Sequence, residues 1–552
     1  MGLNITKHHI GAEIISILTK GMYPDPKDAL REYIQNGIDA NAENIQIKIR
    51  GSSIVVTDNG SGMDEAVMKN AVRVGISDKD PATDVGFRGI GIYSAFHLCD
   101  ELHIYSRSDG EVPHALKFHF KTMRDILDQQ QKNRLKGKIS GDELIDLQSI
   151  LKAHIDISPL KRREFPDVGT RVEMIGVKPS FFKSLLRFEE VADYLRQVVP
   201  LHFDKNNFKW AQKIETRIHN ICKDNRAEFR VIDLDLQVDS QTEKLYRPYI
   251  DALFQDDQCL APVFKPIKSK AEFFGVAWGC LNATRRKISD TELRGFLLTK
   301  QGFALGKRSE MAKHFGKRTT YFDRYVGEII VVAADLLPNA ARTDFEASPL
   351  RTSFYEALAG VAADFNGEAD KHQEYTLGDD QIAEAIEVIN AKESTITFNY
   401  DRADQLLDDL VEIRVLRRKL EGRLERDSVR PSRIDEAHTI IKSAKALEKE
   451  IQRFVESKNQ RASKKPTKTA EERSRERRSR LIDSERSKEV RKPAESLLEV
   501  LDNLDISLSK EAKQAIEIID ERFLQGLASN KTDYLLLLKD FAQELADSLP
   551  GE

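Results

Sequence analysis

The sequence predicts an α+β fold, with helices packed on one face of a sheet in its first part and an almost wholly helical last part. The stretches "IQIKI" and "IVVT", joined by "RGSS" within residues 45–57, alternate apolar and polar residues and so predict a strand hairpin. Residues 10–42 carry apolar residues at helical spacing, and from about residue 380 only helical patterns remain. Mixed helices and strands followed by helices alone favour an α+β protein with a separate helical region.

Length and composition describe a soluble globular protein of several domains. At 552 residues the chain exceeds a single hydrophobic core, and it is 40% hydrophobic and 32% charged with a formal net charge of −4. The four cysteines are widely spaced and form no CxxC pair, which argues against a disulfide framework or structural zinc and favours a reducing, cytoplasmic location. Because no apolar window reaches the roughly 18 residues of a membrane helix, we expect no membrane span.

The first domain is expected to cover residues 1–182. After the hairpin, strands are predicted at "ELHIYSRS", "HALKFHF" and "GTRVEMIGV". A polar helical insertion is predicted between the last two of these, over about 121–155. This region therefore supplies both the sheet and the helices of the predicted α+β layer.

A second α/β domain is expected over residues 183–375. Its predicted strands are "AEFFGVAWGCL", "RGFLLTKQGFAL" and "VGEIIVVAADLL". Residues 376–457 are predicted to form a helical coiled-coil region, interrupted at Pro431. Its seam is expected to use Leu406, Leu410, Ile413, Leu420 and Leu424, with Arg417 at the remaining seam position.

Two further segments complete the chain. Residues 458–492 hold 14 Lys and Arg against 6 Asp and Glu, a local net charge of +8, so 458–493 is predicted to be a basic linker. Such a stretch is usually a solvated linker, and contact with the phosphates of nucleic acid is the alternative. Residues 494–552 are predicted to form a small helical bundle.

The stretch "REYIQNGIDA" places three polar side chains on one face of a helix. Glu32, Asn36 and Asp39 stand four and three residues apart, so they face the same side. An amide oxygen is a hard, neutral ligand suited to magnesium. A carboxylate one turn away can orient and deprotonate an attacking water. Taken alone, the triplet is more typical of an exposed helix face.

A second motif, "VVTDNGSGM", follows a predicted strand. Asp58 stands at the strand end, where a carboxylate can accept a hydrogen bond from an exocyclic amine such as that of adenine. Gly60 and Gly62 allow the backbone to approach a flat ring closely. The competing interpretation is an ordinary Asn-Gly turn.

Phosphate binding is suggested by "GFRGIGIYSAF". Gly86, Gly89 and Gly91 lead into a helical pattern, where free backbone N–H groups can receive a phosphate. The sequence contains no GxxxxGK[ST], which excludes the P-loop route to ATP. In "GTRVEM", Thr170 offers a hydroxyl at the start of another strand.

Together these motifs resemble the GHKL superfamily of ATPases. The order E-x-x-x-N, D-x-G-x-G, G-x-x-G-x-G and G-T over about residues 1–180 is similar to the ATP-binding, or Bergerat, fold of gyrase-type topoisomerases, ninety-kilodalton heat-shock chaperones, histidine kinases, MutL and MORC proteins. The resemblance implies that the first domain is a Bergerat-fold α/β sandwich that binds ATP and Mg²⁺.

The resemblance also implies roles for individual residues. Glu32 is expected to be the general base, Asn36 the magnesium ligand and Asp58 the partner of the adenine amine. Met63 is expected to pack on the base, and Thr170 to support the aspartate through water. Residues 75–91 are expected to be a mobile lid, with the glycines at its hinge. The full expected set of nucleotide-contacting residues is Asn36, Asp39, Asp58, Gly60, Gly62, Met63, Gly86, Arg88, Gly89, Gly91 and Thr170.

In dimeric members of the superfamily, a transducer domain supplies a cation to the γ-phosphate. Lys300 in "LLTKQGFAL" is similar to the transducer lysine of the topoisomerase and MutL branches. Arg342 in "LLPNAARTDFE" resembles the chaperones' phosphate-sensing arginine. Either cation would neutralise charge that develops during phosphoryl transfer, and either is also compatible with an ordinary solvated strand end.

The function implied by the resemblance is an ATP-hydrolysing homodimeric clamp. ATP is expected to be hydrolysed slowly to ADP and phosphate, and the amino-terminal domains to dimerise on binding it. A chaperone-like clamp acting on a client protein or partner subunit is the first hypothesis. A MORC- or MutL-like ATPase of anti-phage defence or DNA repair, contacting DNA or RNA through 458–492, is the alternative. We expect neither a histidine kinase, since no phosphoacceptor helices precede the domain, nor a gyrase, since no cleavage module is recognisable.

Overall fold

The computed structural model describes residues 10–463, with gaps at 24, 78, 80–85, 87–88, 141–142, 255–257, 271, 285, 317–318 and 397–402. The chain divides into two compact units. One comprises residues 1–397 and 405–448, and the other 398–404 and 449–552. The described residues of the second unit belong to two helices. The predicted bundle 494–552, and the basic linker from residue 464 onward, lie outside the described residues.

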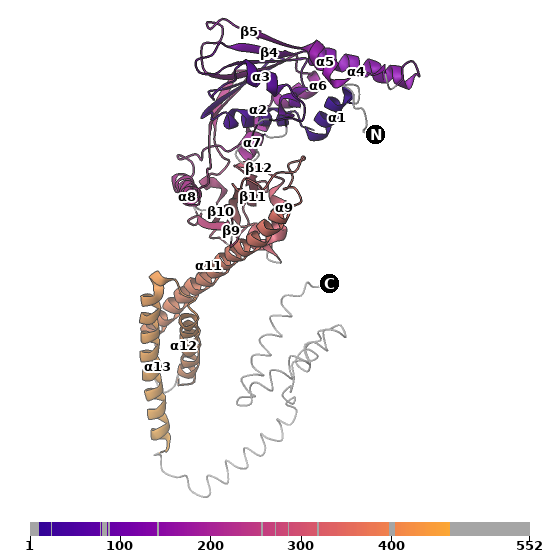
Figure 1. The fold of residues 1–552 in the computed structure, drawn as a ribbon. Coiled ribbons are helices and arrows are strands. Elements are labelled where there is room, and N and C mark those ends of the chain that lie inside the picture. The colour runs from indigo at the N-terminus through magenta and orange to yellow at the C-terminus, as the bar shows by residue number, and fades with distance from the viewer. Residues whose placement is uncertain are drawn as a thin grey trace. The chain divides into compact units, whose positions relative to one another are not determined.

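Two sheets organise the first unit (Figure 1). Eight strands form the first in the order β5-β4-β3-β6-β2-β1-β7-β8, and five form the second in the order β12-β11-β13-β10-β9. The strands are β1 (Asn44–Arg50), β2 (Ser53–Asp58), β3 (Glu101–Arg107), β4 (His114–Phe118), β5 (Ile155–Pro159), β6 (Gly169–Ile175), β7 (Asp233–Val238), β8 (Gln241–Leu245), β9 (Val263–Lys268), β10 (Phe273–Leu281), β11 (Gly295–Lys300), β12 (Phe303–Ala304) and β13 (Tyr325–Val331).

The predicted hairpin forms the middle of the first sheet. β1 and β2 pair antiparallel, with Ile45 opposite Asp58 and Arg50 opposite Ser53. The other side of β2 pairs with β6, which brings Asp58 opposite Thr170. Two residues that are distant in the sequence thereby become cross-strand neighbours.

The first sheet extends beyond residue 182, where the sequence suggested that the first domain ends. β7 pairs in parallel with β1, and β8 then pairs antiparallel with β7. A parallel pair needs a long crossover connection, and here the chain passes through helices between β6 and β7. The local alternation of residues does not reveal a pairing between strands so far apart in the sequence.

Helices cover one face of this sheet (Figure 1). The strands β1 to β3 alternate buried and more exposed residues, which is the pattern of a sheet packed on one side only. Apolar residues of α2 and α7 share a hydrophobic core with the inward residues of those strands. The mixed α+β class is therefore confirmed. The α-helices are α1 (Glu13–Met22), α2 (Lys27–Asp39), α3 (Glu65–Ala71), α4 (Phe120–Leu135), α5 (Leu147–His154), α6 (Pro179–Leu185), α7 (Phe188–Val198), α8 (Ala211–Asp224), α9 (Arg308–Met311), α10 (Thr319–Phe322), α11 (Pro349–Thr395), α12 (Ala403–Glu425) and α13 (Ile434–Ser463).

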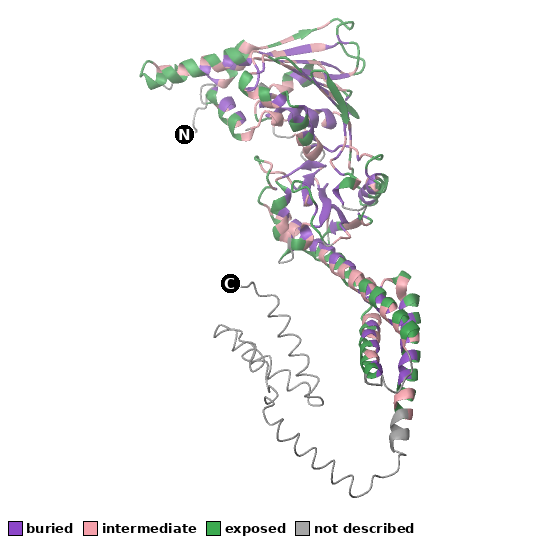
Figure 2. Ribbon diagram, turned by 180° about the vertical axis from the view of Figure 1, so that it is seen from behind, coloured by how far each residue is buried: buried purple, intermediate pink, exposed green. Residues whose placement is uncertain are grey.

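The second sheet is buried on both faces, as the purple strands in Figure 2 show. Its central strand β13 alternates between two cores. Val326 and Ile330 pack with α8, whereas Ile329 and Val331 pack with α11. Burial on both sides explains why these strands read as continuous apolar runs in the sequence.

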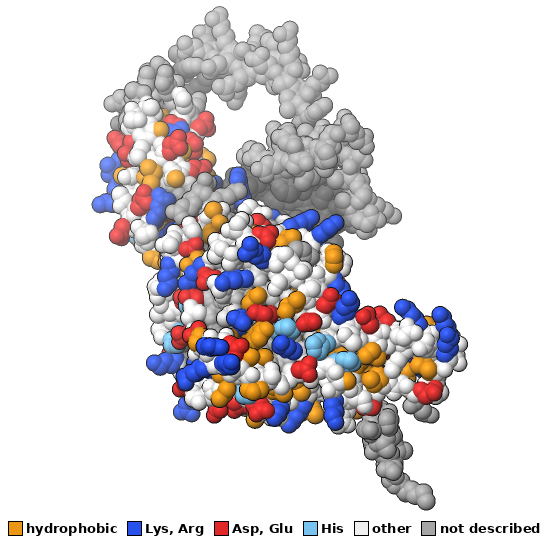
Figure 3. All heavy atoms as spheres, turned by 90° about the horizontal axis from the view of Figure 1, so that it is seen from above, with side chains coloured by type: hydrophobic (Ala, Val, Ile, Leu, Met, Phe, Trp, Pro, Cys, Tyr) orange, Lys and Arg blue, Asp and Glu red, His pale blue; other side chains and the backbone are white. Residues whose placement is uncertain are grey.

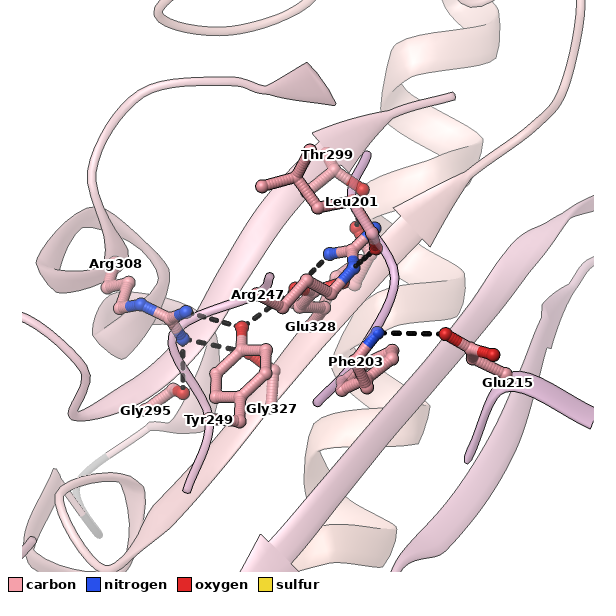
Figure 4. A network of polar contacts seen from close by, with 11 residues as sticks. Leu201, Phe203, Glu215, Arg247, Tyr249, Gly295, Thr299, Arg308, Gly327 and Glu328 are labelled. Carbon is pink, nitrogen blue, oxygen red and sulfur yellow. Dashed lines mark hydrogen bonds and ion pairs between the residues drawn. The ribbon is translucent and has the colours of Figure 1, made fainter. Parts of the chain in front are cut away.

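A buried polar network joins the second sheet to the segment that enters it (Figure 4). Arg247 forms an ion pair with Glu328 on β13 and donates to the Leu201 carbonyl over 2.8 Å. Tyr249 donates to the same glutamate over 2.7 Å and accepts from Arg308 over 2.6 Å. Because each charged group is buried, these contacts fix the arrangement of β11 and β13.

The last part of the first unit is helical, as predicted. α12 buries one side, made of Leu406, Leu410, Ile413, Leu416 and Leu420. The seam therefore uses Leu416 where we expected Arg417. Arg417 lies at the edge of the buried side, with its Nε 2.6 Å from Glu448 of α13, because its charge finds a partner there.

Among the described residues, no helix is both long and apolar enough to cross a membrane. The four cysteines are all buried and unpaired.

Candidate functional site

A cavity of about 430 Å³ lies between the first sheet's helices and the end of β11. Its size falls within the range of small-molecule sites. Most of the residues predicted from the sequence line it. These are Glu32, Asn36, Asp39, Asp58, Gly62, Met63, Gly86, Gly89, Gly91, Thr170, Lys300 and Arg342. Gly60 is not among the lining residues, and Arg88 lies outside the described residues.

Glu32 and Arg342 form an ion pair within this cavity. The Glu32 side chain is only 4% exposed, and it comes from the middle of α2. Arg342 adopts a left-handed backbone conformation with a φ of 53°, which is uncommon for a residue with a side chain. Gly91 faces the same carboxylate, and a Cβ there would stand 2.5 Å from Glu32 Oε2. Glycine at position 91 therefore leaves room for the acid.

Asn36 and Asp39 share a cation. Lys79 Nζ lies 2.9 Å from Asn36 Oδ1 and 2.7 Å from Asp39 Oδ2. The backbone N–H of Gly86 also donates to Asp39, over 3.0 Å. One turn of α2 thus offers two oxygens that converge on a single positive charge, as the helical spacing predicted.

Asp58 lines the cavity from the end of β2. Its carboxylate accepts from the Gly60 N–H over 2.9 Å, which gives Gly60 a supporting place behind the cavity wall. Burial raises the pKa of Asp58 to about 6, although hydrogen bonds from the Gly60 and Thr170 backbone lower it. This side chain therefore changes charge close to neutral pH.

Ser106 organises the cavity wall beside Asp58, and sequence reasoning did not identify it. Its hydroxyl donates to the Gly169 carbonyl over 2.8 Å and lies 2.9 Å from Thr170 Oγ1. The Met63 N–H donates to Ser106 Oγ over 2.8 Å. Gly62, with a φ of 67°, lets the chain pass so close that a Cβ would overlap the Arg107 carbonyl.

Lys300 reaches the cavity from the end of β11. Its ammonium donates to the backbone carbonyls of Ala333 and Ala334. Burial lowers the pKa of Lys300 to about 8. The Gln301-Gly302 turn after the strand has a positive φ at both residues, which suits a tight hairpin into β12.

Arg31 is a basic residue of the cavity that, like Ser106, sequence reasoning did not identify. Its guanidinium donates to the Ala304 carbonyl over 2.7 Å and lies over the Phe303 ring. Burial, and then the charge of Arg342, lower the pKa of Arg31 to about 10. Next to it on α2, Gln35 lines the cavity, and its buried Oε1 has no hydrogen-bond partner among the described residues. A bound donor would satisfy that oxygen.

Residues 24–143 match the family described as "Histidine kinase-, DNA gyrase B-, and HSP90-like ATPase". That segment carries the Glu32, Asn36 and Asp58 motifs of the cavity. This segment is a GHKL-type ATPase domain.

Among curated proteins, the chain is similar to two over short segments. It is 31% identical over 110 residues to "Putative type II restriction enzyme HgiDII" of Herpetosiphon aurantiacus, covering 18% of each chain. It is 37% identical over 93 residues to "DNA mismatch repair protein MutL" of Agrobacterium fabrum, covering 15% of each chain. The matches thus span less than a fifth of these relatives.

Among solved structures, one similar chain is titled "Crystal Structure of N terminal domain of a DNA repair protein". It is 14% identical and covers 64% of this chain and 98% of its own, with a TM-score of 0.35.

The glycine-rich segment of the GHKL domain differs in one respect from expectation. The helical pattern after Gly89 is a 3-10 helix, Gly91–Ala95, rather than the start of an α-helix. Gly89 has a φ of 64°, and a Cβ there would overlap the backbone of Ile76. The tight path of this segment explains the glycine, whereas its binding of phosphate stays a prediction.

The oxygens of the GHKL cavity fit a magnesium ion. Asn36 and Asp39 already hold a cation in the form of the Lys79 ammonium, so their oxygens are arranged for positive charge. Amide and carboxylate oxygens are the ligands that Mg²⁺ prefers. A Cβ on Gly86 would lie 3.3 Å from Asp39 Oδ2 and 3.6 Å from Asn36 Oδ1, so glycine keeps the space beside them free.

Proposed function

We propose that this chain is a magnesium-dependent ATPase that slowly converts ATP and water to ADP and phosphate. One observation carries the proposal. A buried acid, a pair of cation-binding oxygens, a carboxylate suited to an amine, and two basic side chains all line the same cavity of GHKL type. This combination matches the separate needs of a base, a metal, a purine and a triphosphate.

Asp58 would hold the adenine. Its carboxylate is fixed by the Gly60 and Thr170 backbone, and its oxygens have further lone pairs that can accept from the exocyclic amine. Met63 would lie against the ring, because Ser106 fixes its backbone at the cavity wall. The hydroxyl of Thr170, held beside Ser106, would support the carboxylate through water.

Glu32 would act as the general base. Its ion pair with Arg342 holds the carboxylate in the cavity, where a carboxylate can accept a proton from water. A triphosphate entering the cavity competes for the Arg342 guanidinium, because its terminal oxygens carry more charge than one carboxylate. Arg342 would then neutralise charge that develops on the phosphoryl group, and Glu32 would be free to orient the attacking water.

Asn36, with Asp39 beside it, would hold the magnesium ion, which when bound neutralises phosphate charge and orients the leaving group. Lys79 would leave these oxygens when the metal arrives and stay near the phosphates as a lid residue. Lys300 supplies a second basic group on the side of β11.

Variants that separate binding from turnover test the ATPase. Glu32→Ala is expected to abolish hydrolysis, a loss on the order of 10²- to 10⁴-fold, while nucleotide binding survives. Asp58→Asn is expected to lose nucleotide binding. Glu13→Ala changes an exposed glutamate of α1 and serves as the control. Retained turnover in the Glu32 variant, with binding also retained, would exclude Glu32 as the base.

We further propose that ATP drives two copies to close as a clamp that works with nucleic acid. One relative is named as a DNA mismatch repair protein and the other as a putative type II restriction enzyme, which favours this alternative over the chaperone-like clamp. The basic stretch 458–492 supplies the charge for phosphate contacts. On the face drawn in Figure 3, described acidic and basic side chains are interspersed, so the basic stretch is the stronger candidate.

Stimulation of hydrolysis decides between the two partners. ATPase rates are measured with DNA, with RNA and with an unfolded protein, in the full chain and in a variant lacking 458–492. Stimulation by nucleic acid that the deletion removes supports the proposal. Indifference to nucleic acid, together with suppressed aggregation of the unfolded protein, would favour the chaperone-like clamp. Sizing and crosslinking with a non-hydrolysable ATP analogue test closure.

A further inference from the structure

Helix α12 presents an aliphatic stripe to solvent on the side opposite its buried one. Leu407, Val411 and Val415 are 42%, 60% and 47% exposed. They are spaced four residues apart, so they form one ridge along the helix. Figure 2 shows exposed residues along this helix. Three large aliphatic side chains in a row on an otherwise charged helix form a patch that needs explanation.

The inner side of α12 is already occupied. Lys392 of α11 pairs with Asp409 and Glu412, and Glu448 of α13 pairs with Arg417. These contacts, with the buried leucines, hold α12 to the two longer helices of the same chain. The outer ridge is therefore not used in packing α12 onto its own neighbours.

Charge is divided along the outer side of α12. Asp408, before Val411, is exposed, and so are Arg418 and Lys419, which follow it. Glu412, also exposed, pairs with Lys392 of α11, which offsets its charge. A second α12 laid antiparallel, with a two-fold axis at Val411, brings Leu407 opposite Val415 and Val411 opposite itself. The acidic half of each helix then faces the basic half of the other, whereas a parallel pair would set like charges together.

We propose that α12 pairs antiparallel with α12 of a second copy of this chain, through Leu407, Val411 and Val415. The surface is self-complementary, because aliphatic residues meet aliphatic residues and acidic residues meet basic ones. A two-fold interface requires this. Three residues on each side bury less area than a stable dimer of standard size needs, so the contact is weak alone and adds to other contacts between copies. The proposal uses no nucleotide and is independent of the proposed ATPase.

Cysteine crosslinking in the full chain tests the geometry. Val411→Cys places two thiols on the two-fold axis, so this variant is expected to form a disulfide-linked dimer readily under mild oxidation. The four native cysteines are buried, which keeps the background low. Leu407→Cys is the matched control, because antiparallel pairing keeps its two copies apart. A mixture of Leu407→Cys and Val415→Cys chains is expected to crosslink.

Each other outcome overturns the proposal. If Leu407→Cys alone crosslinks as fast as Val411→Cys, the helices pair in parallel. If Val411→Cys fails to crosslink over a concentration series, the ridge has another occupant. Protection of that thiol from a maleimide reagent in the monomer, if lost when residues 464–552 are deleted, would identify that segment of the same chain as the occupant.

Charge reversal tests the electrostatic half of the argument without new thiols. Asp408→Lys makes both halves of the stripe basic, and Arg418→Glu combined with Lys419→Glu makes both halves acidic. Each variant alone is expected to self-associate more weakly, on the order of tenfold in Kd. An equal mixture restores opposite charges across the seam and is expected to recover association in sedimentation velocity. No recovery in the mixture would overturn antiparallel pairing.

Discussion

Arg342 forms an ion pair with Glu32 across the cavity, and the two residues come from different layers of the first unit. Glu32 lies on α2, which packs on the eight-stranded sheet, whereas Arg342 follows the last strand of the five-stranded sheet. A buried carboxylate is costly without a partner of opposite charge. This contact therefore balances the charge of Glu32 and also links the part of the unit around the first sheet to the part around the second. A ligand that attracts Arg342 would change both at once.

Arg342→Ala is expected to lower kcat about 10²-fold or more and to change KM much less. The lost cation would act on charge that develops in the transition state, and this affects the chemical step more than ground-state binding. Steady-state ATPase kinetics measure the split. Lys313→Ala, an exposed residue of the same region, is the control. An equal rise in KM with unchanged kcat would instead assign Arg342 to ground-state binding.

Helical periodicity was sufficient to predict the α2 side of the cavity. Glu32, Asn36 and Asp39 needed only spacing, and all three line the cavity. Ser106 could not be predicted in this way, because its partners Gly169 and Thr170 meet it only through the pairing of β3 with β6. Local patterns indicate which face a residue takes, whereas contacts between distant strands depend on register.

Charged residues were the hardest to place from the sequence. Lys79 stands in a polar stretch that reads as an ordinary loop, yet its ammonium reaches Asp39 on α2. On α12, the expected seam position of Arg417 went to Leu416, one residue away. A one-residue step turns a helix by about 100°, so small errors in periodicity move a charge from a core to its edge.

The pKa of Asp58 predicts that base preference depends on pH. With a pKa of about 6, the carboxylate that accepts from the adenine amine is lost as pH falls from 7 to 5. The protonated carboxyl donates a hydrogen bond instead. This suits inosine triphosphate, whose base carries an oxo group where adenine carries its exocyclic amine. The ratio of ATP to inosine triphosphate affinity is expected to fall about tenfold per pH unit below the pKa.

Isothermal calorimetry with both nucleotides at several pH values measures this ratio. Protonation of the triphosphate affects both affinities equally, so it cancels in the ratio. A ratio that stays constant between pH 7 and 5 would contradict the role of Asp58. Linkage gives a second check. Because the folded pKa is raised, the stability that proton binding to Asp58 contributes is full below about pH 4 and is lost as pH rises through about 6.

Lys79→Met is expected to make the protein respond to magnesium in the absence of nucleotide. The Asp39 side chain is 4% exposed, and the variant loses the ammonium at 2.7 Å. A divalent cation can then take its place between Asp39 and Asn36. Added MgCl₂ should therefore raise the Tm of the variant by about 2–4 °C more than that of the unchanged protein.

Differential scanning fluorimetry with MgCl₂, against NaCl of equal ionic strength, measures the shift. Lys69→Met removes an exposed lysine of α3 that pairs with Glu65, and it should leave the magnesium response unchanged. An equal response in both variants would argue that Asn36 and Asp39 form no cation site of their own.

The network in Figure 4 predicts where stability is concentrated in the second sheet. Glu328→Gln removes the charge that balances Arg247 and leaves that buried guanidinium uncompensated. Breaking a buried pair in this way costs about 3–5 kcal/mol of unfolding free energy. The strand that carries Lys300 pairs with the strand that carries Glu328, so the loss should also loosen one wall of the cavity.

Tryptophan fluorescence reports this loss directly. Both tryptophans of the chain lie near this sheet, and Trp278 is fully buried with its ring 5.2 Å from that of Tyr249. The urea midpoint of the fluorescence transition should fall in Glu328→Gln and stay unchanged in Glu292→Gln, where the glutamate is exposed. Equal midpoints in the two variants would show that Arg247 is stabilised by its carbonyl contact at Leu201 and not by the charge of Glu328.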